Sequence, residues 1–382
     1  MKTHGELQML ENEQEKRAEE ELESIVIEDP KAPETKEQKK KKRRNRAIII
    51  LIFIAVNVLV IGYTALNEFG NKPAEKLQIH FGVSGTLCIL AAIGCLLLAL
   101  AFETIKYLVM MKSFGAKVSV KAAFQTAAIG KYYDNITPSG IGGQPFQIYT
   151  MHKFGYSTGE SVCMPLIQFL TMQTAFIFLA IVFIIFKNDI IPNNAMKIAV
   201  YFGVFSYSTG PLGVIFFTVW RRACVAVINL IVKILAKFRV FKDPEAKKEQ
   251  IIKYLDEYRA SIVLISRNKG VIIKTFVLSV FYQLALFCIP YFVLLAFNGS
   301  ADLINTVAMV SFVYCACTFI PTPGNAGAAE GAFYLIFSQL DPTGLFWSML
   351  VWRGICFYAI IALGIGIYGF NAIAERKNHG KT

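Results

Sequence analysis

Long apolar blocks recur along this chain, and they constrain its fold more than any other feature. A helix that crosses a bilayer needs about 20 consecutive apolar residues. Of the 382 residues, 55% are hydrophobic and 17% are charged, whereas a soluble domain carries about 25% charged residues. Blocks of spanning length lie at residues 47–66, 84–102, 161–186, 198–219, 271–297, 303–320 and 345–370. The sequence therefore predicts an all-α polytopic integral membrane protein.

Two shorter apolar segments, at 118–147 and 321–340, are interrupted by Gly and Pro. We expect about seven to nine membrane segments, including these two as Gly/Pro-broken re-entrant or half-helix segments. Lys and Arg gather on the cytoplasmic side of membrane proteins. Residues 220–270 and the last residues, 373–382, are basic, which favours a cytoplasmic position for both. Seven spans between two cytoplasmic ends need one more crossing, and 326–340 is the candidate.

Residues 1–46 form a separate charged tail, with 12 acidic and 12 basic side chains. Its composition predicts a disordered cytoplasmic tail, and its polybasic end, Lys39–Arg46, predicts a topology signal that also suits anionic lipid. A nucleic-acid signal is the alternative, which the apolar blocks disfavour. We therefore divide the chain into the tail, a transmembrane domain at 47–372 with cytoplasmic or interfacial helices at 220–270, and a cytoplasmic end at 373–382.

Signatures of metal or nucleotide chemistry are missing from the sequence. The eight cysteines form no CxxC pair and lie in or beside apolar blocks, which is typical of small core residues. The four histidines have no ligand spacing, and there is no P-loop, HExxH or GxSxG motif. We expect no metal, no cofactor and no ATP-driven pump.

The broken segments carry the functional argument. Tyr132–Gln147 and Ile320–Phe333 both run Thr-Pro, then Gly, then small residues, then a polar residue and Phe. Proline stops a helix, and glycine lets the backbone turn and approach a ligand. Paired interruptions at matching places indicate the binding site of a transporter. Close helix contacts or ordinary turns are the alternative.

A half-helix that begins after such a break would direct free N–H groups and a positive dipole end into the membrane. Such an end binds anions, and phosphate is the common anion of a bilayer. Asp134 and Glu330 lie within the two broken segments as acids without an evident partner. Charged groups inside a membrane are costly, so these two indicate function.

Two further charged features lie in or beside the spans. Arg353, inside the last block, offers a bidentate fork for a lipid phosphate. The alternatives are an ion pair with Glu330 or Asp341, or a side chain that reaches to the surface. Glu103 and Lys106 are one helical turn apart at the end of a block, and we expect a surface pair.

Together, the two broken blocks and Trp352-Arg353 resemble the flippase-like transmembrane domain of the lysylphosphatidylglycerol synthase family over about residues 47–372. The resemblance implies a bacterial plasma-membrane protein that handles lipids. In full-length relatives this domain translocates aminoacylated phosphatidylglycerol, and a soluble domain transfers lysine from charged tRNA. The chain leaves no room for that soluble domain, so lysyl transfer is not expected of it alone. Matched by motif, the implied lipid-binding residues are Asp134, Asn135, Thr137, Pro138, Gly142, Gly143, Gln144, Pro323, Gly324, Gly327, Glu330 and Arg353.

Two departures from the family pattern bear on the substrate: Asp134 stands where Asn is expected, and Asn325 where a second Gly is usual. Our leading hypothesis is a flippase for an anionic or lysyl-modified phosphatidylglycerol-type lipid, or for a polyprenyl-phosphate carrier. The half-helix ends and Arg353 would hold the phosphate, and Glu330 and Asp134 would meet an amine or carry a proton.

Two other functions stay open. One is phosphatidylglycerol lysyltransferase activity, and the other is an accessory role in the lipid modification that confers resistance to cationic antimicrobial peptides. The expected partners are anionic or aminoacylated membrane phospholipids and no nucleic acid, with a homo-oligomer left open.

Overall fold

The computed structural model describes the chain from residue 82 to residue 379, together with residues 62 and 66. Within that range the description omits residues 138–139, 141, 238–244, 246–247, 250, 253–267, 298–300, 319, 321 and 341–343. The predicted tail at 1–46, nearly all of the predicted first span at 47–66, Pro138 and Asp341 therefore lie outside the described residues.

The regular elements of the described residues are all helical, which confirms the predicted fold class. In order they are α3 (Val83–Ser113), α4 (Val120–Ile136), α5 (Gly143–Lys153), α6 (Thr158–Lys187), a 3₁₀ turn (Asn188–Ile190), α7 (Asn194–Val219), α8 (Arg221–Lys237), α10 (Lys269–Ala296), α11 (Leu303–Cys317), α12 (Ala328–Phe337), α13 (Leu345–Arg353), a π turn (Gly354–Tyr358) and α14 (Ala359–His379).

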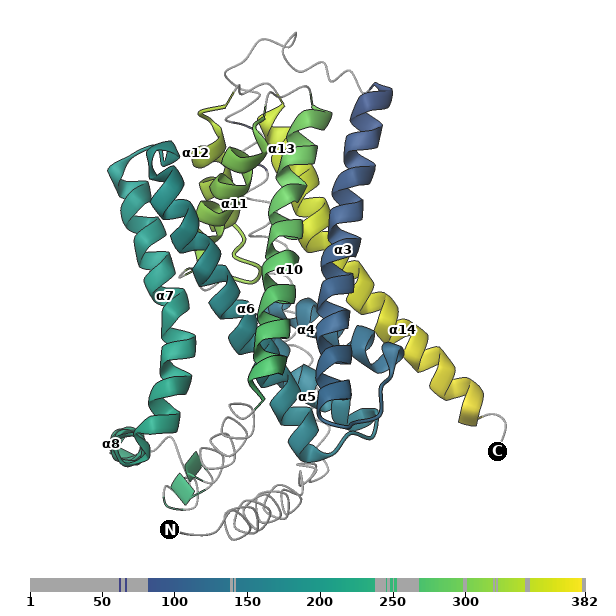
Figure 1. Cartoon of the computed structure of the whole chain (residues 1–382), viewed down its shortest axis with the longest axis vertical. Helices are drawn as coiled ribbons and strands as arrows, with labels where there is room; N and C mark the ends of the chain where they lie inside the picture. Colours follow the sequence, from purple (N-terminus) through teal and green to yellow (C-terminus); the bar gives the residue numbers. More distant parts are fainter. Residues whose placement is uncertain are drawn as a thin grey trace.

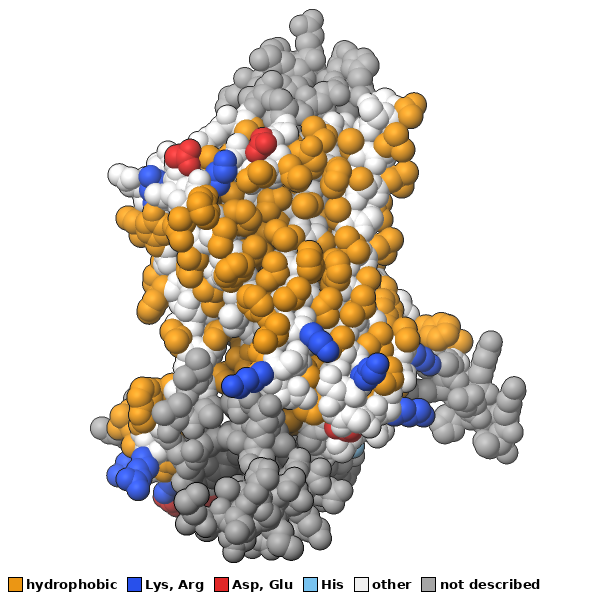
Figure 2. Space-filling model, viewed as in Figure 1, with side chains coloured by type: hydrophobic (Ala, Val, Ile, Leu, Met, Phe, Trp, Pro, Cys, Tyr) orange, Lys and Arg blue, Asp and Glu red, His pale blue; other side chains and the backbone are white. Residues whose placement is uncertain are grey.

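Several helices are suited to cross a membrane. Four stretches of the described chain are long and apolar enough: Val83–Ser113, Thr158–Ile190, Lys269–Ala296 and Leu345–Asn371. Helices α11 and α12 are apolar but shorter. Figure 2 shows a broad orange band of apolar side chains across the visible face of the bundle, with charged side chains above and below it. The chain is therefore a multi-pass membrane protein.

Buried apolar side chains, in one large cluster and three smaller ones among the described residues, hold the bundle together. Helix α10 lies at its centre and packs against α3, α6, α11 and α13. The largest cluster of buried apolar side chains joins these helices to α12 (Figure 1). Helix α8, which begins the predicted interfacial region, lies across the bundle axis at its lower end.

Both predicted breaks are present. The first separates α4 from α5, and the second is a loop that precedes the short helix α12. In Figure 1, α4 and α5 occupy the lower half of the bundle, and α11, α12 and α13 the upper half. The two broken segments thus approach the middle of the protein from opposite ends.

Candidate functional site

At the first break, side chains of α4 hold the beginning of α5. Thr137 Oγ1 accepts a hydrogen bond from the N–H of Gly142 at 2.9 Å. Asp134 Oδ1 accepts one from the N–H of Gly143, also at 2.9 Å. A Cβ at Gly142 would collide with the Thr137 side chain, and one at Gly143 with the Asp134 carboxylate. Glycine is therefore required here by close approach, as the sequence predicts.

The second break depends on a left-handed backbone. Gly324, Asn325 and Gly327 have φ angles of 58°, 53° and 88°. Among the described residues, Asn325 alone is a non-glycine residue with positive φ. Asparagine tolerates this region better than most L-residues, which explains how Asn325 can stand where the resemblance predicts a second glycine. Thr322 Oγ1 donates to the carbonyl of Ala326 at 2.9 Å and closes the turn.

Glu330 and Arg353 clamp this second loop. Glu330 Oε2 accepts from the N–H of Gly327 at 2.7 Å, and Oε1 accepts from Arg353 Nε at 2.7 Å. Arg353 Nη1 donates to the carbonyl of Gly324 at 3.2 Å, and Nη2 to that of Asn325 at 3.4 Å. The alternative in which Arg353 forms an ion pair with Glu330 is therefore confirmed, and the pair is buried.

These bonds correct two expectations. The N–H groups of Gly143 and Gly327 are not free, because Asp134 and Glu330 occupy them. The two acids are not without partners either: Asp134 Oδ2 also lies 4.0 Å from Lys131 Nζ. The physical reason is that orphan N–H groups at a helix end need acceptors in an apolar environment, and a nearby carboxylate is a strong one.

A cavity of about 590 Å³ lies between the two breaks. The predicted residues Asp134, Asn135, Gln144, Gly324 and Arg353 all line it, although they come from segments that are about 200 positions apart in the sequence. The other predicted residues that are described do not line it: Thr137, Gly142, Gly143, Pro323, Gly327 and Glu330. Most of this second group shape and clamp the loops that form the walls.

Unpaired amide groups face this cavity. Asn135 Nδ2, Gln144 Nε2, Gln147 Oε1 and Gln173 Oε1 are buried and have no hydrogen-bond partner among the described residues. The side chain of Gln147 is 1% exposed. Buried polar atoms are nearly always hydrogen-bonded, so these amide atoms can bond to water or to a polar ligand inside the cavity.

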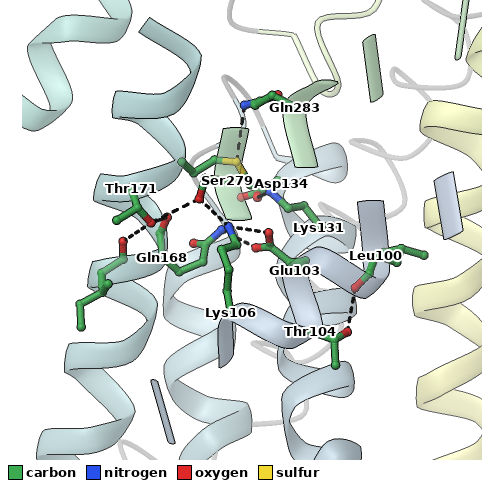
Figure 3. A network of polar contacts seen from close by, with 12 residues as sticks. Leu100, Glu103, Thr104, Lys106, Lys131, Asp134, Gln168, Thr171, Ser279 and Gln283 are labelled. Atoms are coloured by element: carbon green, nitrogen blue, oxygen red, sulfur yellow. Dashed lines mark hydrogen bonds and ion pairs between the residues drawn. The ribbon is translucent and has the colours of Figure 1, made fainter. Parts of the chain in front are cut away.

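Beside the cavity lies a buried polar network that the sequence did not predict (Figure 3). Glu103 and Lys106 do pair, at 2.7 Å, but both side chains are 0% exposed, so the expected surface position is wrong. Gln168 Nε2 donates to Glu103 Oε1 at 2.6 Å, and Lys106 Nζ donates to Ser279 Oγ at 3.1 Å. The apolar block ends near Glu103, but α3 continues to Ser113 and keeps the pair inside the bundle.

Lys131 connects this network to the cavity. Its ammonium lies 4.9 Å from the centroid of the Tyr282 ring, and Lys106 Nζ lies 5.5 Å from the same centroid. Lys131, Tyr282 and Gln168 all line the cavity. Sequence reasoning missed Lys131 and Gln147. The available signal was a lysine three residues before Asp134 and a glutamine one turn after Gln144.

Comparisons with known proteins agree with this architecture. The family described as "Lysylphosphatidylglycerol synthase TM region" matches residues 47–364. A "UPF0104 membrane protein" of Methanothermobacter thermautotrophicus is 22% identical over 336 residues, which cover 85% of this chain and 95% of the relative. A protein of the same description from Archaeoglobus fulgidus is 22% identical over 338 residues, covering 85% and 97%. The chain therefore belongs to the family of the lysylphosphatidylglycerol synthase transmembrane region.

Proposed function

We propose that this chain translocates phospholipids across a cell membrane, and that the head group passes through the cavity between the two broken segments. The lipid would be an anionic or lysyl-modified phosphatidylglycerol type, or a polyprenyl-phosphate carrier. One observation carries the proposal: Asp134, Asn135 and Gln144 of the first break line the same cavity as Gly324 and Asn325 of the second break and Arg353, which clamps that second loop.

The energetics support this assignment. Moving a charged head group through hydrocarbon is expensive, because nothing there replaces its hydration. Lys131 and Asp134 offer charges of opposite sign, and the unpaired amides add donors and acceptors. Non-helical backbone at membrane depth is tolerated where it lines a cavity inside the protein. The apolar band in Figure 2 would leave the acyl chains in the bilayer.

We further infer that both termini face the cytoplasm. Lys and Arg side chains gather below the apolar band in Figure 2, at the end of the bundle where α14 ends. The positive-inside rule assigns that side to the cytoplasm.

The test uses the purified full chain in proteoliposomes that carry a fluorescent phosphatidylglycerol. A membrane-impermeant quencher then reports how fast labelled lipid reaches the outer leaflet. Gln147→Leu should slow this exchange about tenfold, which corresponds to the loss of about one hydrogen bond of ~1.4 kcal/mol.

The matched control is Gln339→Leu, because Gln339 is an exposed glutamine outside the cavity that bonds to the carbonyl of Ile190. We expect the control to keep the wild-type rate. The proposal fails if wild-type vesicles behave like protein-free vesicles with each of the three lipid types. The site assignment fails if the two Leu variants slow exchange equally.

A further inference from the structure

Three described residues that line the cavity carry charge: Lys131, Asp134 and Arg353. Arg353 is already engaged. Its Nε bonds to Glu330, and its two Nη atoms bond to carbonyls of the second loop. A ligand that took over this guanidinium would release the loop and leave Glu330 buried without its counter-ion. Arg353 therefore clamps the second loop, and another residue of the cavity must bind the phosphate.

Lys131 is the other cation of the cavity, and its charge is only loosely matched. Its distance to Asp134 Oδ2, 4.0 Å, is too long for a hydrogen bond. Glu103 is an acid of the adjoining network, but its two oxygens are occupied by Lys106 at 2.7 Å and by Gln168 at 2.6 Å. Glu103 still attracts the Lys131 ammonium electrostatically, and the neutral Tyr282 side chain lies against it, but both Glu103 oxygens are already engaged. The Lys131 ammonium therefore remains able to bind an anion.

Within the described part of the chain, only one of the two carboxylate oxygens of Asp134 accepts a hydrogen bond. Its Oδ1 accepts from the N–H of Gly143 and fixes the carboxylate, while Oδ2 takes part only in the long pair with Lys131. A cation could bind at Oδ2 without disturbing the beginning of α5. The cavity thus presents one anion site and one cation site side by side on the same turn of α4.

Unpaired amides lie beside the anion site at Lys131 and the cation site at Asp134, which we call the two half-sites. Asn135 lies one helical turn after Lys131, and Gln144 and Gln147 lie one turn apart on α5, so each pair shares a face of its helix. An amide offers both a donor and an acceptor. These groups can therefore bond to phosphate oxygens and to the N–H groups of an amine.

We infer that the cavity selects a zwitterionic phospholipid head group, with its phosphate at Lys131 and its ammonium at Asp134, over an anionic one. A zwitterion replaces the Lys131–Asp134 pair charge for charge. A single anion would bind beside a carboxylate that has lost its counter-ion, which is unfavourable in a medium of low dielectric constant. The inference rests on the proposed function in one respect, namely that the ligand is a membrane lipid. Among the proposed lipids it favours lysyl-modified phosphatidylglycerol, which carries ammonium groups as well as the phosphate, over the purely anionic ones.

The experiment measures binding to the purified full chain in detergent by titration calorimetry. Two dioctanoyl lipids with the same tails are compared, one with a phosphoethanolamine and one with a phosphoglycerol head group. The wild type should bind the ethanolamine lipid about tenfold more tightly. Soluble glycerophosphoethanolamine is the third ligand, and it should bind far more weakly than the lipid if the cavity serves lipids.

Two variants separate the two half-sites. Lys131→Met should weaken both lipids, because both carry the phosphate. Asp134→Asn keeps an oxygen that can accept from Gly143, and it should bring the ethanolamine lipid down to the affinity of the glycerol lipid. Lys274→Met and Asp302→Asn are the controls: Lys274 is an exposed lysine on α10, and Asp302 is an exposed cap of α11.

Equal wild-type affinity for the two lipids would overturn the inference, and this result depends on no variant. An Asp134→Asn protein that loses affinity for both lipids equally, or free head group that binds as well as lipid, would also contradict it. If the preference is found but proteoliposomes show no exchange, the proposed translocation fails and the head-group site stands. If exchange is found without the preference, only the site is wrong.

Discussion

Replacing Lys106 by Met should destabilise the protein strongly, because it leaves the Glu103 carboxylate inside the bundle without its counter-ion. The two side chains are 2.7 Å apart and 0% exposed. At that distance two unit charges attract each other by about 6 kcal/mol for an effective dielectric constant of ~20. Desolvation opposes this by several kcal/mol for each ion, so the intact pair contributes little net free energy.

Replacing one partner of such a pair has a different effect from replacing both. Loss of one partner leaves an uncompensated buried charge, which costs about 3–5 kcal/mol. The double variant Glu103→Gln/Lys106→Met removes both charges and keeps similar volumes, so we expect it to lie within about 1–2 kcal/mol of the wild type. The two single changes should therefore be far from additive.

Equilibrium unfolding in mixed micelles with increasing dodecyl sulfate would measure these free energies. Lys248→Met is the matched control, because Lys248 pairs with Glu245 at the same i,i+3 spacing but on the surface, with 79% of the Glu245 side chain exposed. This control should lower the free energy of unfolding by less than about 1 kcal/mol. The reasoning is refuted if Lys106→Met costs no more than this control, or if the double variant equals the sum of its singles.

Two other substitutions test the breaks. Gly143→Ala should lower stability by about 1–3 kcal/mol, because its Cβ would meet Asp134 and the carbonyl of Gly130. In the control Gly331→Ala the Cβ has open space, so this variant should be neutral or stabilised by up to about 1 kcal/mol. Similar thermal unfolding midpoints for the two variants would contradict this prediction. Asn325→Ala should cost about 1–2 kcal/mol, since Asn325 has φ 53°, and Asn325→Gly should keep the wild-type midpoint. An alanine variant as stable as the glycine variant would show that the left-handed backbone is not needed.

Much of the architecture follows from the sequence because the bilayer imposes simple demands. The predicted spans at 84–102, 161–186 and 198–219 lie within long helices, and the span at 271–297 extends one residue beyond the end of α10. The block at 345–370 is one apolar stretch, but it contains a π turn directly after Arg353. Hydropathy reports the length of a block and is insensitive to the winding of the helix inside it.

The sequence predicts the two breaks because Pro and Gly act on the local backbone. It does not predict which residues of distant helices contact one another. Nothing in the sequence near Glu103 indicates that Gln168 and Ser279 complete a network around it and Lys106, since these residues come from α6 and α10. The end of the apolar block suggested the end of the helix, so the pair was placed at a surface. Lys131 was overlooked because its role depends on Tyr282, on another helix.

The carboxylate at each helix end affects whether small anions can leak through a head-group pathway. A pathway wide enough for a head group must still not conduct chloride. Open helix N-termini at mid-membrane would attract small halides, because their partial positive charge is always present. Here Asp134 and Glu330 already accept hydrogen bonds at the two helix ends, so the positive ends of both half-helix dipoles are offset by carboxylates within the protein. In a lipid translocator of this kind, a small anion would be drawn into the cavity by Lys131 and not by open helix ends.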